Sequence, residues 1–153
     1  MAQLFLLEPD AVATVRAADK GQVLGALADR FAAVYGLDRG DVLDRIEERE
    51  RLGSTGFGRG VASPHARIAG VTEPVAAFLR LETPVAFDAA DAMPVGLVFG
   101  LLSPEQGGAS HLQALAAISR MMRDERMRTN LETAPDDDAI YGLLCNVIDR
   151  DAA

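Results

Sequence analysis

Apolar residues recur at helical spacing near both ends of the chain and form continuous runs in its middle. From Asp19 they repeat every three or four residues up to Tyr35, which predicts a helix that is capped by Asp19 and ended by Gly36. Asp38 predicts the cap of a second amphipathic helix, which Gly53 ends.

The middle of the chain has the pattern of a sheet. Residues 53–60, GSTGFGRG, predict a loop, and the short apolar stretch Val61–Ala62 predicts a brief strand that leads to His65. Residues 75–81 predict a further strand, for which Thr83–Pro84 predicts the end. The run VGLVFGLL at residues 95–102 is apolar throughout, as expected for a central strand covered on both faces.

The last third predicts three helices. Ser110 is the expected cap of the first, Asp124 that of a short second helix, and Pro135 with the acidic run 136–138 begins the third. Strands enclosed between helices at both ends indicate an α/β protein with a covered sheet.

Composition narrows the class of protein. The 153 residues suit one domain over 1–153, and an apolar content of 49% is enough for a core. A net charge of −8 argues against a nucleic-acid partner, and the single Cys excludes an internal disulfide or a cysteine zinc site. No segment resembles an export signal or a membrane span, so we expect a cytoplasmic protein with no membrane insertion. Two histidines and scattered aspartates make a poor zinc site, so we expect no metal, and we expect no cofactor.

Two histidines are the candidate reactive groups. His65 follows Pro64 beside the glycine-rich loop, and Pro64 stiffens the approach to it. His111 lies near a helix start after the central strand, where ligands of open α/β sheets gather and where free N–H groups attract phosphate. Taken singly, each histidine is equally consistent with a purely structural position.

Arg49 and Arg51 immediately precede the glycine-rich loop. Two interpretations of these arginines are open. Their positive charges complement the dipole at the end of the helix, or a guanidinium beside the hydroxyls of Ser54 and Thr55 binds an oxyanion in a forked geometry. The loop lacks the Gly-Lys-Ser/Thr ending of a P-loop and does not fit the dinucleotide fingerprint.

Together these segments carry a family resemblance. Residues 49–56 read Arg-Glu-Arg-Leu-Gly-Ser-Thr-Gly, and they are followed by Gly58 and Gly60, Ala62-Ser63-Pro64-His65, LETPVAFD at 81–88, PVGLVF at 94–99 and HLQAL at 111–115. This order resembles the mannitol/fructose-type EIIA domains of the bacterial phosphoenolpyruvate-dependent phosphotransferase system (PTS). The Gly-Ser-Thr-Gly form and the stand-alone length look most like the nitrogen-regulatory branch of that family.

The resemblance implies a three-layer α/β/α sandwich with a mixed sheet, and a phosphoryl carrier. It implies that His65 is phosphorylated, that His111 is the second active-site histidine and that Arg49 is the active-site arginine. Because phosphoryl transfer depends on positioning and charge stabilisation, we also expect the loop donors around Ser54 and Thr55 to bind the phosphoryl group. The family usually has Gly after the active histidine, whereas this chain has Ala66. Either the backbone there accepts Ala, or the loop geometry and transfer rate differ.

Two functions follow from the resemblance. In both, the donor is a phosphorylated HPr-like carrier. In the first, phosphorylation of His65 controls binding to regulatory target proteins. In the second, the group passes to a separate EIIB for carbohydrate uptake. Because the sequence carries no EIIB or membrane segment, we favour the regulatory function.

Overall fold

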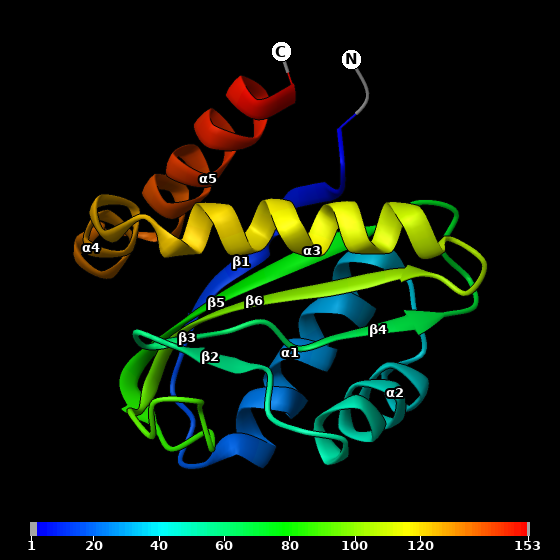
Figure 1. The fold of residues 1–153 in the computed structure, drawn as a ribbon, viewed down its shortest axis with the longest axis horizontal. Coiled ribbons are helices and arrows are strands. Elements are labelled where there is room, and N and C mark those ends of the chain that lie inside the picture. Colours follow the sequence, from blue (N-terminus) through cyan, green and yellow to red (C-terminus); the bar gives the residue numbers. More distant parts are fainter. Residues whose placement is uncertain (1–2, 153) are drawn as a thin grey trace.

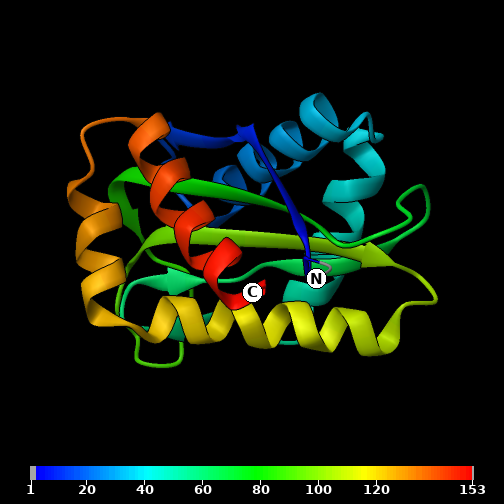
Figure 2. The same ribbon diagram turned by 90° about the horizontal axis from the view of Figure 1, so that it is seen from above.

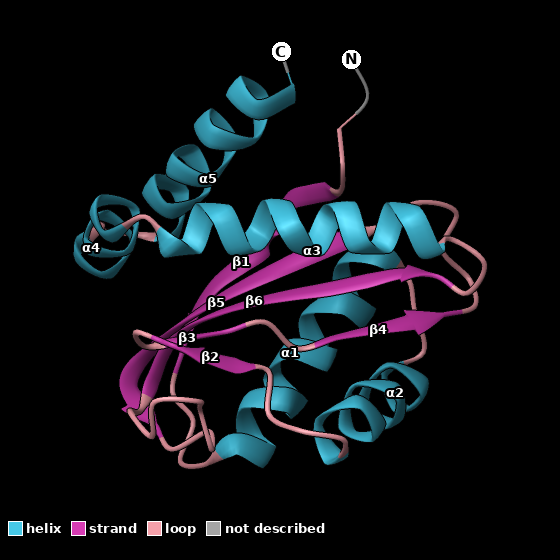
Figure 3. Ribbon diagram, viewed as in Figure 1, coloured by secondary structure: helices cyan, strands magenta, loops and turns pink. Residues whose placement is uncertain are grey.

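The longest apolar run of the chain forms the middle of a mixed sheet (Figure 3). The computed structural model describes residues 3–152. The strand order is β1-β5-β6-β3-β2, and β4 also pairs with β6. The β5–β6 and β2–β3 pairs are antiparallel and the others parallel. The strands are β1 (Leu6–Val15), β2 (Gly56–Gly58), β3 (Val61–Ala62), β4 (His65–Ile68), β5 (Val75–Val85) and β6 (Val95–Pro104).

Helices cover both faces of this sheet. Figure 1 shows α1 and α2 below it and α3 and α5 above it, and Figure 2 shows the same layers from above. The three-layer α/β/α sandwich with a mixed sheet is therefore confirmed. The helices in the described part of the chain are α1 (Lys20–Tyr35), α2 (Arg39–Arg51), α3 (Gly108–Arg123), α4 (Glu125–Thr133) and α5 (Asp137–Ala152). None of them is long and apolar enough to cross a membrane.

The core lies where β5 and β6 meet the helices. Phe78 and Phe99 face each other across the β5–β6 pair with ring centroids 5.5 Å apart, edge to face, and both are fully buried. Aromatic rings prefer this arrangement because the positive edge of one faces the negative face of the other. Close packing of this kind fixes β6, whose far end leads to the candidate site.

The N-terminal strand was not expected from the sequence. Pro9 and Asp10 interrupt its apolar pattern, and the structure accommodates them with a register shift against β5 between Leu7 and Val12. Proline and acidic residues occur in strands mainly at edges and bulges, and β1 is an edge strand.

Other strand boundaries differ from those expected. β5 continues through Thr83–Pro84 to Val85. Its pairing with β6 is irregular between Arg80 and Val85, so the strand tolerates a proline there, which has no N–H to donate to β6. The expected loop 53–60 contains β2, which pairs with β3. His65 does not close a strand but begins β4, which pairs with β6.

Asp caps were predicted more accurately than the Ser cap. Asp19, Asp38 and Asp124 each accept a backbone N–H at the start of α1, α2 and α4. The expected cap Ser110 instead lies inside the first turn of α3, which begins after Gly107, and its hydroxyl donates to the Gly107 carbonyl at 3.0 Å. His111 consequently lies one turn into the helix.

Candidate active site

The His65 ring is held in one tautomer by the backbone. Its Nδ1 lies 2.8 Å from the carbonyl oxygen of Ser63, and since a carbonyl only accepts, Nδ1 carries the proton and donates it. The other ring nitrogen, Nε2, keeps its lone pair. Burial lowers the pKa of His65 below its usual value and Arg49 lowers it further, against the opposing effects of the Ser63 carbonyl and Glu50. The ring is therefore neutral and nucleophilic at neutral pH.

His111 lies beside His65 in the site. The two ring centroids lie 5.5 Å apart at an interplanar angle of 53°. His111 Nδ1 lies 2.7 Å from the hydroxyl oxygen of Ser103, which is fully buried near the end of β6. Burial, with smaller effects of His65 and Arg67, lowers the pKa of His111 to about 4. His111 is thus uncharged at neutral pH and anchored to the sheet.

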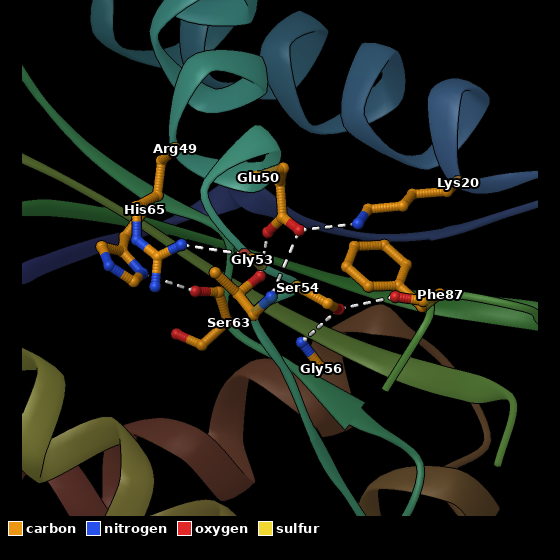
Figure 4. Close-up of polar contacts among 10 residues, drawn as sticks. Lys20, Arg49, Glu50, Gly53, Ser54, Gly56, Ser63, His65 and Phe87 are labelled. Carbon is orange, nitrogen blue, oxygen red and sulfur yellow. Dashed lines mark hydrogen bonds and ion pairs between the residues drawn. The ribbon is translucent and has the colours of Figure 1, made fainter. Parts of the chain in front are cut away.

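Arg49 reaches the site from the last turn of α2. Its Nη1 donates to the carbonyl of Gly53 at 2.9 Å, which joins the helix end to the glycine-rich loop (Figure 4). A hollow of about 400 Å³ is lined by Arg49, His65 and His111 together. The structure therefore brings these three sequence-predicted residues to one place. Because the guanidinium has five N–H donors, its bond to Gly53 leaves others for an anion.

Ser54 and Thr55 lie in a second hollow of about 280 Å³ that also includes Arg49 and His65. Their hydroxyls are engaged in hydrogen bonds within the protein, however, and Figure 4 shows those of Ser54. Ser54 Oγ donates to the Phe87 carbonyl at 2.6 Å and accepts the N–H of Gly56 at 3.0 Å. The Thr55 hydroxyl bonds to the Glu50 carboxylate. The two side chains hold the shape of the loop.

Sequence reasoning missed Arg67, Ser103 and Glu50. Arg67 lines the first hollow. It is two residues after His65 in β4, and strand alternation, which places residues i and i+2 on one face, is the signal that could have found it. Ser103 and Glu50 carry no such signal, because the path of the turn before α3 and of the loop after α2 decides that they meet His111 and Thr55.

Large apolar side chains are exposed around these hollows. Leu52 is 83% and Leu112 65% exposed, and both line the larger hollow, while Phe57, 39% exposed, lines the smaller one. An exposed apolar cluster beside a reactive group is typical of a protein-binding surface.

Residues 5–147 match the family described as phosphoenolpyruvate-dependent sugar phosphotransferase system, EIIA 2. The chain belongs to this EIIA family. It is 39% identical over 140 residues to a nitrogen regulatory protein of Bradyrhizobium diazoefficiens, a match that covers 91% of this chain and 92% of the relative. A fructose-specific EIIA component of Haloferax volcanii and a fructose-specific EIIABC component of Bacillus subtilis match shorter stretches of this EIIA chain, of 112 and 107 residues.

Solved structures agree with this assignment. The crystal structure of the nitrogen regulatory protein IIA-Ntr from Neisseria meningitidis superimposes with a TM-score of 0.84 at 33% identity, covering 90% of this chain and 95% of that one. Mannitol enzyme IIA of Escherichia coli, in its complex with phosphorylated enzyme IIB, shares the fold with a TM-score of 0.76 at 18% identity, covering 92% and 99% of the two chains.

Proposed function

We propose that this EIIA protein carries a phosphoryl group on Nε2 of His65, received from a phosphorylated HPr-like carrier, and acts as a regulatory protein of the cytoplasm. The observation that carries the proposal is the Nδ1–H bond from His65 to the Ser63 carbonyl at 2.8 Å. It leaves Nε2 as the only nucleophilic atom of a ring whose pKa is lowered. A phosphoryl carrier needs such a neutral imidazole at physiological pH.

The other site residues supply charge and position. Phosphoryl transfer depends mainly on positioning and electrostatic stabilisation, and Arg49 offers a planar fork of donors to phosphoryl oxygens. A Ser103 hydroxyl that donates to Nδ1 of His111 leaves the Nε2–H of His111 to donate to a phosphoryl oxygen. Ser54 and Thr55 act indirectly, since their hydroxyls hold the loop to which Arg49 is bonded.

The surface around the site supports a role in partner binding. Leu52, Phe57 and Leu112 are exposed beside His65, so that a phosphorylated His65 adds negative charge to a contact region that combines apolar side chains with arginines such as Arg49 and Arg67. A charge placed within an apolar interface disrupts some contacts and creates others with cationic partners. Phosphorylation would thereby select between regulatory targets, and the HPr-like carrier would dock on the same region.

The nitrogen regulatory relatives, which match most of the chain, favour this regulatory function. The alternative is transfer to a separate EIIB for carbohydrate uptake, and the matching fructose-specific components favour it. The two functions are separated by adding a purified EIIB from the same organism to the phosphorylated protein. Rapid loss of the group to EIIB supports sugar transport, and retention of the group contradicts it.

The proposed function is tested by incubating the purified protein with phosphoenolpyruvate, the first enzyme of the system and the HPr-like carrier. The phosphate is then mapped by mass spectrometry under alkaline conditions, because acid hydrolyses phosphohistidine. We expect one phosphoryl group on His65 and none in folded His65→Ala. Undiminished labelling of that variant would overturn the assignment.

A further inference from the structure

Glu50 is a buried carboxylate beside the site that the proposed chemistry does not use. It follows Arg49 at the end of α2, and its side chain is only 5% exposed. Its oxygens accept the N–H of Thr55 at 3.2 Å, the Thr55 hydroxyl, and Nζ of Lys20 at 2.8 Å (Figure 4). A carboxylate taken out of water in this way requires such partners.

From Glu50 a continuous chain of hydrogen bonds leads to the reactive ring. Thr55, whose N–H is bonded to Glu50, accepts the N–H of Ser63 on its carbonyl at 3.0 Å. The carbonyl of Ser63 in turn accepts Nδ1–H of His65 at 2.8 Å. Ser63 is fixed from the other side as well, because its hydroxyl donates to the Phe99 carbonyl of β6 at 2.9 Å.

Lys20 binds Glu50 at the other end of this series of hydrogen bonds. It is the first residue of α1, its side chain is 23% exposed, and its ammonium lies 4.7 Å from the centroid of the Phe87 ring. The Phe87 carbonyl also accepts the Ser54 hydroxyl. Lys20 therefore joins α1 to the end of α2, through Glu50, and to the segment after β5, through Phe87.

A buried ion pair by itself is weak support for stability, because desolvation of the two charges offsets most of their attraction. Here the pair is tied to the loop of the reactive histidine. We propose that the Lys20–Glu50 pair is a positioning device that fixes the tautomer and orientation of His65 through Thr55 and Ser63. Glu50 is the positioning residue, and Lys20 holds it in place. The inference rests on the proposed function of His65.

The charge of Glu50 also suits the transfer step. When Nε2 of His65 attacks, a nitrogen–phosphorus bond forms, the bond from phosphorus to the donor atom of the carrier breaks, and its electron pair stays on that donor. Nδ1 keeps its proton, so the ring of His65 becomes positive. The charged and titratable groups that line the larger hollow with this ring are Arg45, Glu48 and Arg49 of α2, Arg67 of β4 and His111 of α3. Glu50 of α2 raises the pKa of His65 against the effect of Arg49.

The test compares Glu50→Gln with Asp44→Asn, which removes the same charge from an exposed position of the same helix. Nitrogen-15 NMR of the His65 ring reports its tautomer and pKa, and labelling from the phosphorylated carrier reports the rate. We expect the Nδ1–H tautomer of the wild type to become a mixture in Glu50→Gln, with a further fall in the pKa of His65. Labelling should slow by about 10–100-fold, as for loss of a group that orients a histidine ligand.

Two further variants keep the test decisive if Glu50→Gln folds poorly. Lys20→Met keeps the contact with Phe87 and removes the cation, and Thr55→Val removes one bond to Glu50; both should shift the tautomer in the same direction. A His65 tautomer and labelling rate equal to those of Asp44→Asn in these folded variants would overturn the inference. A wild type that is not labelled on His65 would instead overturn the proposed function, while the tautomer comparison still decides the positioning role.

Discussion

His65 and His111 lie with their ring centroids 5.5 Å apart although they come from elements far apart in the chain. Their proximity follows from the sheet. His65 begins β4, which runs parallel to the last part of β6, where Arg67 pairs with Ser103. The chain then turns after Pro104 and starts α3, so that His111 returns over the same end of the sheet and bonds to Ser103.

We expect His111 to assist phosphorylation without carrying the group. Replacing it by Ala removes a neutral donor from the hollow but leaves the His65 nucleophile and its bond to Ser63 intact. The initial rate of labelling should fall by about 10–100-fold, with the remaining phosphate still on His65. Gln113→Ala, an exposed change on the same helix, is the control and should label normally. A His111→Ala protein with the control's rate would contradict this role.

His111 should also make folding stability depend on pH. Its pKa is about 4 in the folded protein and about 6.5 when unfolded, so the unfolded chain binds more protons between these values. Stability contributed by His111 is therefore complete above pH 6.5 and falls as the pH drops towards 4, by on the order of 2 kcal/mol.

Urea unfolding at pH 7 and pH 5 measures this effect in the wild type and in His111→Asn. Carboxylates also titrate towards the lower pH, so the informative quantity is the difference between the two proteins. The wild type should lose more stability than the variant on acidification. Equal losses would show that His111 is not held neutral by the fold.

For Arg49, substitutions separate its charge from its geometry. Lys keeps the charge but loses the planar fork, so Arg49→Lys should lose much of the labelling rate and Arg49→Gln more. A tenfold loss corresponds to about 1.4 kcal/mol of barrier. Arg51 lies in the same last turn but lines neither hollow, which makes Arg51→Gln the matched control for an effect on the helix end. Labelling rates that fall equally in both Gln variants would assign Arg49 to helix stability alone.

Segments with one strong local signal were predictable from the sequence. Asp19 and Asp38 start α1 and α2 as expected, because a capping carboxylate and the apolar spacing act within one turn. β1 was missed because Pro9 and Asp10 conceal it, and only its pairing with β5 keeps the strand extended on both sides of the bulge. Strand pairing is a property of the tertiary structure, which local patterns do not contain.

The same distinction applies to the site. The resemblance pointed to His65, His111 and Arg49, and the structure brings all three to one hollow. The hydroxyls of Ser54 and Thr55 were expected to face a phosphoryl group, whereas they bond to Phe87 and Glu50. The sequence of a short loop shows which polar groups it contains but not their partners, since those come from the segment after β5 and from α2.

Ala66 occupies the position where the family usually has Gly, and the backbone accepts it. It lies within β4, is 9% exposed, and is not among the residues with positive φ. Ala66→Gly should therefore leave labelling unchanged and destabilise the strand by about 0.5–1 kcal/mol through the greater freedom of the unfolded chain. Thermal unfolding and the labelling assay check both parts. Faster labelling of the Gly variant would show that Ala66 constrains the active loop.

Gly100 and Gly142 should respond in opposite directions to the same change. A Cβ added to Gly100 in β6 would lie 2.7 Å from Cδ2 of Leu27, a fully buried side chain of α1, whereas one added to Gly142 in α5 meets nothing within 4 Å. Gly100→Ala should cost about 1–3 kcal/mol through overpacking, and Gly142→Ala should gain about 0.5–1 kcal/mol of helix propensity. Denaturant unfolding measures both changes in stability.

Shortening Leu27 to Val in the Gly100→Ala protein should recover part of the loss, because the clash lies with the end of the Leu27 side chain. A double variant less stable than the sum of its single changes predicts would show that the strain lies in the backbone of β6 instead.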